Sequence, residues 1–213
     1  MKLAVVAGFG VILASVPAQA APDCAADADR LRAHLEDAET KTFRWNTTWS
    51  VLYGAAAVGQ IVLVAIETKP FGTFDTAYRD TLYVGAGKAT LALALRLVSP
   101  LRVSVPARSE DRCAELVTLR STLTTLAKQE RNAFWLGHIG GLALNLGASA
   151  FLWNRHTFTA GAISFAMSFP VGLAGTYTMP RKSWHLWRAE HASWSVAVAV
   201  HPERTMFMLA GEI

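Results

Sequence analysis

A lysine in the middle of an apolar segment is the residue of this sequence whose position most suggests chemistry. Lys88 lies within residues 75–100, a segment apolar enough to enter a bilayer. An ammonium group at that depth costs roughly 2.5 to 3.5 kcal/mol on insertion scales, so we expect it to face polar partners rather than lipid. Gln60 falls near the same depth on the preceding apolar segment, and Asn145 falls near the centre of a later one. The sequence therefore predicts a buried polar cluster of Lys88, Gln60 and Asn145.

Two interpretations of this cluster stay open. A lysine that extends toward the membrane surface and two amides that join helices need no further function. An ionisable group inside a membrane is, however, also a candidate for a binding or conduction site. His138 adds a second such residue, with Gly137 and Gly141 beside it where a neighbouring helix could approach closely. We expect His138 to form a hydrogen bond near the membrane surface, with a proton relay as the alternative.

The sequence gives little support to an enzyme or a metal centre. It contains no GxSxG, HExxH or CxxC motif, and its six histidines show no paired ligand spacing. We therefore expect no catalytic residues, no metal and no cofactor.

The composition indicates a small protein that crosses a membrane several times. Of 213 residues, 52% are hydrophobic and only 17% are charged, and the charges are crowded into a few segments. The calculated pI is near 9.3, but the basic residues are scattered rather than gathered in a run. Nucleic acid is therefore not an expected partner.

Four apolar segments are each long enough to span a hydrocarbon core of about 30 Å as a helix. Their short connections favour antiparallel neighbours, so we expect two transmembrane hairpins. Trp45, Trp49 and Tyr53 recur every four residues at the start of the first segment and are expected to anchor it at the headgroups. The four predicted spans are residues 45–66, 75–100, 133–153 and 157–179.

An amphipathic polar helix is predicted before each hairpin, over residues 24–44 and 110–131. Each half of the chain thus runs from a cysteine through a polar helix and a tryptophan to two spans, which is the plan of an internal duplication. After residue 180, a tryptophan-rich segment suits the membrane interface, and two apolar runs separated by His-Pro-Glu-Arg predict a short β-hairpin. The predicted fold class is therefore an all-α membrane protein with two hairpins of transmembrane helices, two amphipathic soluble helices and a C-terminal β-hairpin.

The first residues have the form of a cleavable signal peptide, with a lysine, an apolar core and Ala-Gln-Ala. Cleavage would place both polar helices and the C-terminus outside the cytoplasm, where we expect Cys24 and Cys113 to form a disulfide. Most lysines and arginines would then lie outside, against the usual bias toward the cytoplasm. The expected organisation is a signal peptide (1–20), an extracytoplasmic helix (21–44), a first hairpin (45–100), an extracytoplasmic linker and helix (101–132), a second hairpin (133–180) and an interfacial segment with the β-hairpin (181–213).

These features predict a non-enzymatic integral protein of the bacterial inner membrane. Its expected partners are the lipid bilayer and either another protein of the cell envelope or a second copy of itself. The alternative is a small channel or transporter with a polar site around Lys88.

Overall fold

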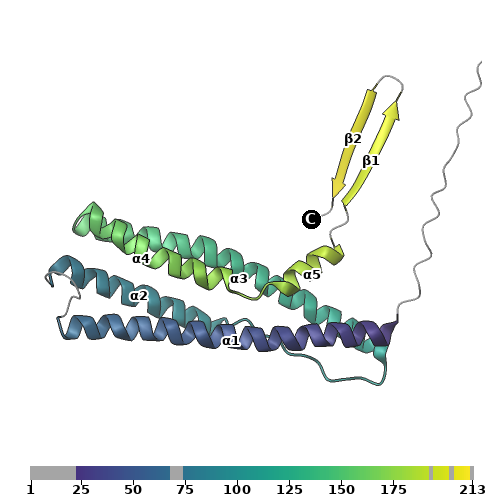
Figure 1. The fold of residues 1–213 in the computed structure, drawn as a ribbon, viewed down its shortest axis with the longest axis horizontal. Helices are drawn as coiled ribbons and strands as arrows, with labels where there is room; N and C mark the ends of the chain where they lie inside the picture. Colours follow the sequence, from purple (N-terminus) through teal and green to yellow (C-terminus); the bar gives the residue numbers. More distant parts are fainter. Residues whose placement is uncertain (1–22, 68–73, 192–193, 202–203, 212–213) are drawn as a thin grey trace, which may run out of the picture.

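The computed structural model describes residues 23–67, 74–191, 194–201 and 204–211, so the predicted signal peptide lies outside the described residues. Within these ranges the chain forms five helices and two strands (Figure 1). They are α1 (Cys24–Ala65), α2 (Thr76–Val98), α3 (Arg112–Arg155), α4 (Phe158–Tyr177), α5 (Lys182–His191), β1 (Trp194–His201) and β2 (Arg204–Gly211).

Helices α1 and α3 are the two long helices, and they begin in the same way. Asp23 caps α1 and Asp111 caps α3, and each carboxylate accepts hydrogen bonds from two backbone N–H groups of the first turn. Cys24 and Cys113 follow these caps and form a disulfide, as the sequence predicted. The two long helices are therefore joined at their first turns.

Each predicted polar helix is continuous with the apolar segment that follows it. Helix α1 has 42 residues and α3 has 44, which gives each a length of more than about 60 Å. Neither residues 42–48 nor residues 127–133 contain proline or glycine, so nothing interrupts the helical hydrogen bonds at the change from polar to apolar sequence. A helix of this length extends well beyond a hydrocarbon core of about 30 Å.

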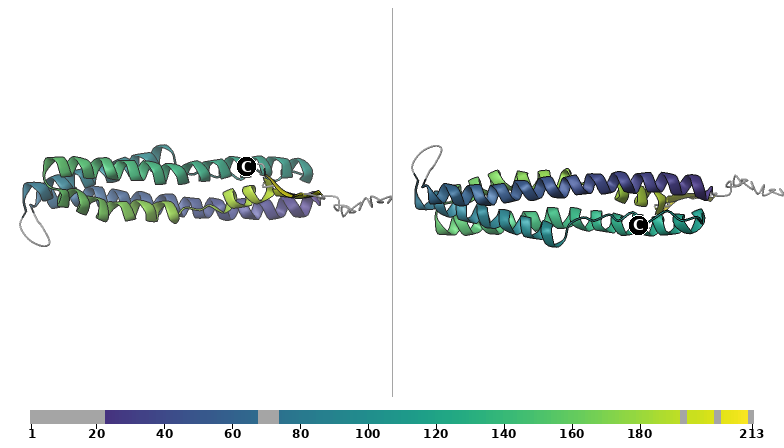
Figure 2. Two further views of the ribbon diagram at one scale, coloured as in Figure 1. Left: turned by 90° about the horizontal axis from the view of Figure 1, so that it is seen from above. Right: turned by 90° about the horizontal axis from the view of Figure 1, so that it is seen from below.

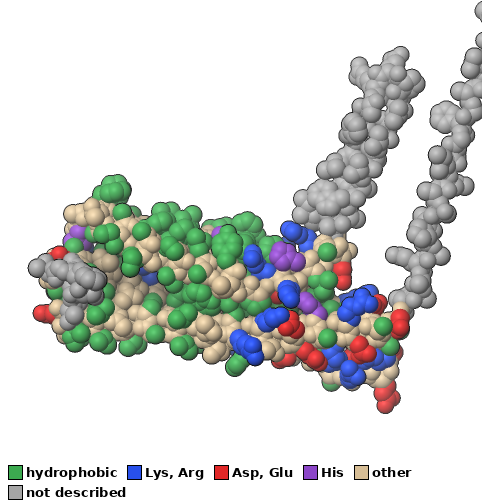
Figure 3. Space-filling model, viewed as in Figure 1, with side chains coloured by type: hydrophobic (Ala, Val, Ile, Leu, Met, Phe, Trp, Pro, Cys, Tyr) green, Lys and Arg blue, Asp and Glu red, His purple; other side chains and the backbone are tan. Residues whose placement is uncertain are grey.

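Four helices, α1 to α4, are long and apolar enough to cross a membrane, which is compatible with the integral membrane protein that the composition predicted. Helix α2 packs along α1, and α4 packs along α3 (Figures 1 and 2). Figure 3 shows apolar side chains over most of the length of the helices and charged side chains gathered toward the end that carries α5. The molecule thus has an apolar part and a charged part.

The charged part has an apolar core of its own. We call it the head and define it as residues 23–44, 101–131 and 180–191. Leu35 of α1 and Leu119 and Leu123 of α3 are almost completely buried there, with Val103 of the connecting segment and Leu186 of α5 packed against them. The head therefore contains the apolar stripes predicted for both amphipathic helices.

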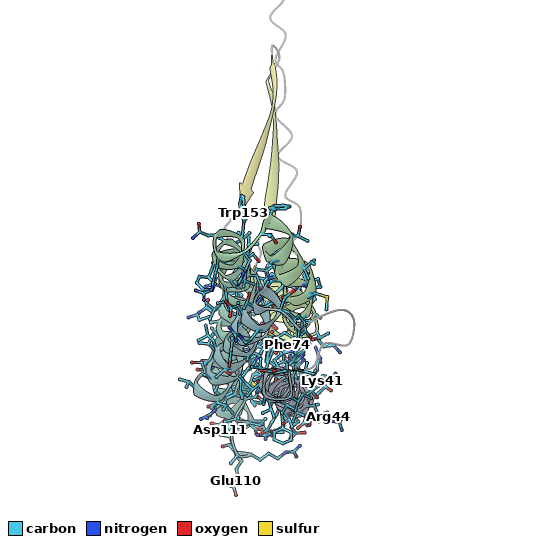
Figure 4. All side chains as sticks on the ribbon, turned by 90° about the vertical axis from the view of Figure 1, so that its left-hand side faces the viewer. Lys41, Arg44, Phe74, Glu110, Asp111 and Trp153 are labelled. Carbon is cyan, nitrogen blue, oxygen red and sulfur yellow. A yellow bond between two sulfur atoms is a disulfide. The ribbon has the colours of Figure 1, made fainter. Side chains whose placement is uncertain are left out.

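A buried ion pair crosses the head core. Arg32 Nε of α1 donates to Glu115 Oε1 of α3 at 2.9 Å, and Arg112 pairs with the other oxygen of the same carboxylate. Other charges of the head point to solvent, as Figure 4 shows for Lys41, Arg44 and Glu110 in its view along the helices. The disulfide and this ion pair both hold α1 against α3.

Close contacts of glycine fix the packing of α3 against α4. A Cβ atom at Gly161 would lie 2.5 Å from the carbonyl oxygen of Ser149, and one at Gly137 would lie 2.5 Å from Thr176 Oγ1. Only a residue without a side chain fits such distances. The close approach predicted at Gly137 is therefore confirmed, and Gly161 provides a second one nearer the opposite end of α4.

The two strands pair with each other as an antiparallel two-stranded sheet. Trp194 lies opposite Gly211 and His201 lies opposite Arg204. Helix α5 occupies the tryptophan-rich segment that precedes them.

Candidate functional site

The side chain of Lys88 lies where three helices meet. Its Nζ, from α2, donates a 2.6 Å hydrogen bond to Ser168 Oγ of α4. Two longer hydrogen bonds of 3.3 Å reach Asn145 Oδ1 of α3 and Ser164 Oγ of α4. Lys88 is 9% exposed, and Asn145 and Ser164 are each 5% exposed. The cluster is therefore buried among α2, α3 and α4.

Local structure explains why these oxygen atoms face the lysine. Ser164 and Ser168 are four residues apart, so they lie on one face of α4. The amide nitrogen of Asn145 donates to the carbonyl oxygen of Gly141 at 2.8 Å, which turns its Oδ1 toward the cluster. The hydroxyl group of Ser168 also lies 2.6 Å from that Oδ1. Asn145 and Ser168 are thus fixed by hydrogen bonds of their own.

The three hydrogen atoms of the ammonium group have three uncharged acceptors. No carboxylate forms an ion pair with Lys88 in the part of the chain that the structure describes. Neutral oxygens solvate the charge without neutralising it. Such a group can hold helices together, and it can also attract an anion or carry a proton.

Gln60 does not belong to this cluster. Its Nε2 donates to the carbonyl oxygen of Ala56 in its own helix at 2.9 Å. Its Oε1 lies against Gly85 of α2, so close that no Cβ atom would fit there. The predicted contact between Gln60 and Lys88 is therefore wrong. Counting residues gives depth in the membrane but not the direction around the helix, and Lys88 extends toward α3 and α4 rather than toward Gln60.

The two serines are the members of the cluster that the sequence did not reveal as partners of the lysine. Ala160, Ser164, Ser168 and Gly172 recur every four residues, a pattern typical of a packing seam of small residues. The same spacing places two hydroxyl groups on one face. The sequence could have identified the two serines from this pair of hydroxyl groups, because they lie at the same depth as the charged Lys88 on another span.

His138 lies in a separate group of aromatic rings. Its Nδ1 is 3.0 Å from the carbonyl oxygen of Phe134, one turn earlier. Its ring centroid is 4.3 Å from that of Phe134 and 5.0 Å from that of Tyr177. Asn145 is seven residues farther along α3, about 10 Å at the helical rise, so His138 is not part of the Lys88 cluster.

The tryptophans at the start of the first apolar segment face the bundle. Trp45 Nε1 donates to the carbonyl oxygen of Gly175 at 3.1 Å, and Trp49 Nε1 donates to Thr178 Oγ1 at the same distance. Both side chains are buried, and the guanidinium carbon of Arg96 lies 3.6 Å from the centroid of the Trp45 ring. The expected headgroup anchors therefore join α1 to α4 inside the protein instead.

At the end of the bundle away from the head, a charged contact joins α2 to the turn between α3 and α4. Arg155 Nε donates to Asp80 Oδ2 at 2.6 Å, and His156 Nε2 lies 3.1 Å from the same oxygen. The two helix pairs are thus joined at four levels: by this contact, by the Lys88 cluster, by the tryptophan hydrogen bonds and by the disulfide.

No group of three or more histidine, cysteine, aspartate or glutamate side chains that could hold a metal ion occurs in the described part of the chain. Comparisons with protein families, with curated proteins and with solved structures find no match. The function must therefore be inferred from the geometry of this chain.

Proposed function

We propose that the protein is a non-enzymatic membrane scaffold of the bacterial cell envelope whose head binds another envelope protein or a second copy of the chain. The observation that carries the proposal is the construction of the head. A disulfide and a buried ion pair hold α1 against α3, and both helices continue without a break into the apolar part. This gives a rigid platform at a defined distance from the bilayer.

The disulfide also supports the proposed location. Disulfides persist in oxidising compartments, so a head locked by Cys24 and Cys113 fits the outer side of the bacterial inner membrane. In that arrangement, residues 1–20 act as a signal peptide, and α1–α2 and α3–α4 cross the bilayer as two hairpins. The C-terminal strands then lie on the same side as the head.

The C-terminal strands support a role in binding. A sheet of two strands has two edges whose backbone groups need partners, and such a sheet has marginal stability alone. We propose that an envelope protein or a second copy of the chain covers one of these edges.

Crosslinking in intact cells tests the scaffold. A photoreactive amino acid at Glu36, an exposed head position, should give protein adducts, whereas one at Leu142, an exposed apolar position on α3, should react mainly with lipid. The Glu36 adducts should weaken in a Cys24→Ser variant. Adducts at Leu142 alone, with a folded protein, would contradict the proposal.

Orientation needs its own measurement. Fusion of alkaline phosphatase to the C-terminus should give an active enzyme, and fusion of a fluorescent protein that matures only in the cytoplasm should stay dark. The reverse result would place the head in the cytoplasm, and the disulfide would then no longer support the proposed location.

The Lys88 cluster favours a second candidate, a small channel or transporter. A buried ammonium group with three uncharged acceptors in the middle of the apolar part is the specific observation. Lys88→Met would abolish flux if the lysine lines a pathway and would leave a scaffold active. Normal flux of a candidate ion in the Lys88→Met variant would rule out the hypothesis that Lys88 lines a transport pathway.

A further inference from the structure

A hollow of about 280 Å³ lies between α1, the last turn of the head part of α3 and the connection from α4 to α5. Met179 and Pro180 form part of its wall, directly after α4 ends at Tyr177. On α3, Glu130 lies one turn before the apolar segment begins. The hollow is therefore at the level where the helices leave the apolar part, and a bilayer crossed by α1 to α4 would place it among the lipid headgroups.

Glu130 is the unusual residue of this wall. It is 1% exposed, and its Oε2 accepts a 2.7 Å hydrogen bond from the backbone N–H of Trp184 in the first turn of α5. Its Oε1 is buried and has no hydrogen-bond partner. A buried carboxylate oxygen without a donor is costly, and a cationic donor would satisfy both its charge and its lone pairs.

Cationic side chains line the same hollow closer to solvent. Lys41 and Lys182 are both exposed, and Arg181 is half-buried over the Phe134 ring. Asp37 pairs with Lys41 and also lies within electrostatic range of Lys182, and Glu130 lies within electrostatic range of Arg181. The hollow thus has a buried carboxyl group, and its rim carries three cationic side chains and one carboxylate.

We propose that this hollow binds a phosphate ester that carries a primary amine, namely the headgroup of an ethanolamine phospholipid. The phosphate lies between Lys182 and Lys41, and the ammonium group donates to Glu130. The proposal depends on the membrane position of α1 to α4 and is independent of the scaffold role.

Size and charge both favour this class of ligand. A volume of about 280 Å³ is at the small end for ligand sites, enough for a headgroup and too small for acyl chains, which stay in the bilayer. A choline headgroup has no N–H to donate to Glu130. A glycerol headgroup has no positive charge that could interact with the Glu130 carboxylate.

Native mass spectrometry of the full-length protein in detergent, titrated with short-chain phospholipids, tests the proposal. Ethanolamine lipid should bind about tenfold more tightly than choline lipid, as expected for one charge-assisted hydrogen bond. Glu130→Gln should abolish this preference, and Lys182→Met should weaken both lipids. Glu36→Gln, at an exposed position outside the hollow, is the matched control and should change neither.

Soluble competitors separate a lipid from a free phosphate ester and need no variant to fold. Glycerophosphoethanolamine should displace the ethanolamine lipid from the wild-type protein, and inorganic phosphate should do so far less well. Equal competition by the two, equal binding of the two lipids, or a preference that survives in Glu130→Gln would each overturn the proposal. Tighter binding of glycerophosphoethanolamine than of the lipid would assign the site to a soluble ligand instead.

Discussion

The substitution Glu130→Gln gives the sharpest prediction about stability. Burial raises the pKa of Glu130 from an ordinary value of 4.5 to about 7, against the opposing effects of the Trp184 N–H, of Ser183 and of the Arg181 charge. The ionised carboxylate is thus less stable in the folded protein than in the unfolded chain. We expect the wild-type head to lose stability as the pH rises, and the variant to lack this dependence.

The magnitude follows from linkage. Below pH 4.5 the carboxyl group is protonated in both states and contributes nothing, whereas above about pH 7 it is ionised in both and the full penalty applies. A shift from 4.5 to about 7 corresponds to about 3 kcal/mol, lost progressively between these two pH values. The glutamine amide leaves a buried N–H group in place of an oxygen, which costs about 1 to 3 kcal/mol at every pH. The slope with pH, rather than the absolute stability, therefore distinguishes the two proteins.

The assay is the free energy of unfolding in detergent micelles, measured by titration with sodium dodecyl sulfate at several pH values between 4.5 and 8. His34 complicates the wild-type curve, because burial lowers its pKa and makes its charged form destabilising at acid pH. The difference between wild type and Glu130→Gln removes that contribution, since both proteins retain His34. If the free energy of unfolding depended on pH in the same way in the two proteins, the conclusion that ionised Glu130 destabilises the folded protein would be refuted.

Three further predictions concern the contacts that join the helices. Cys24→Ser should lower the free energy of unfolding by up to about 4.6 kcal/mol, the loop-closure entropy that a disulfide with a sequence separation of 89 removes from the unfolded chain, and reduced wild-type protein should lose the same amount in the same titration. Lys88→Met should leave stability unchanged or increase it by about 1 to 4 kcal/mol, because Ser168 and Asn145 keep their hydrogen bond to each other, and a large loss would show that the ammonium group is essential to packing. Gly161→Ala should cost about 1 to 3 kcal/mol through the contact with Ser149, whereas Gly172→Ala, whose Cβ meets nothing within 4 Å, should be nearly neutral; equal effects would contradict the packing of α3 on α4.

The sequence predicted the candidate site only in part. Lys88 and Asn145 lie in contact, and both could be placed from their depth in apolar segments. Gln60 has a similar depth but faces Gly85, and the place it was expected to fill belongs to Ser164 and Ser168. Depth depends on position along one helix, whereas contact depends on how two helices are rotated against each other.

The same difference explains the tryptophans of α1. Their spacing of four residues correctly places Trp45 and Trp49 on one face of a helix. Whether that face meets lipid or protein is decided by the end of α4, where the carbonyl oxygen of Gly175 in the last turn and the hydroxyl group of the C-cap residue Thr178 are the acceptors. The sequence of residues 45–53 alone does not indicate that these two acceptors of α4 lie nearby.

The sequence by itself determined the features that are local along the chain. Apolar length defines four helices able to cross a membrane, aspartates placed just before two cysteines define the starts of α1 and α3, and the apolar stripes define the face that each polar helix buries.

Only the tertiary structure decided which polar groups meet. The close approach at Gly161 sets how α4 is rotated on α3, and that rotation brings two hydroxyl groups to Lys88. The connection after α4 likewise places the first turn of α5 on Glu130, which leaves one carboxylate oxygen without a partner beside a hollow. These contacts join residues far apart in the sequence, and their geometry depends on the packing of whole helices, which no short stretch of sequence encodes.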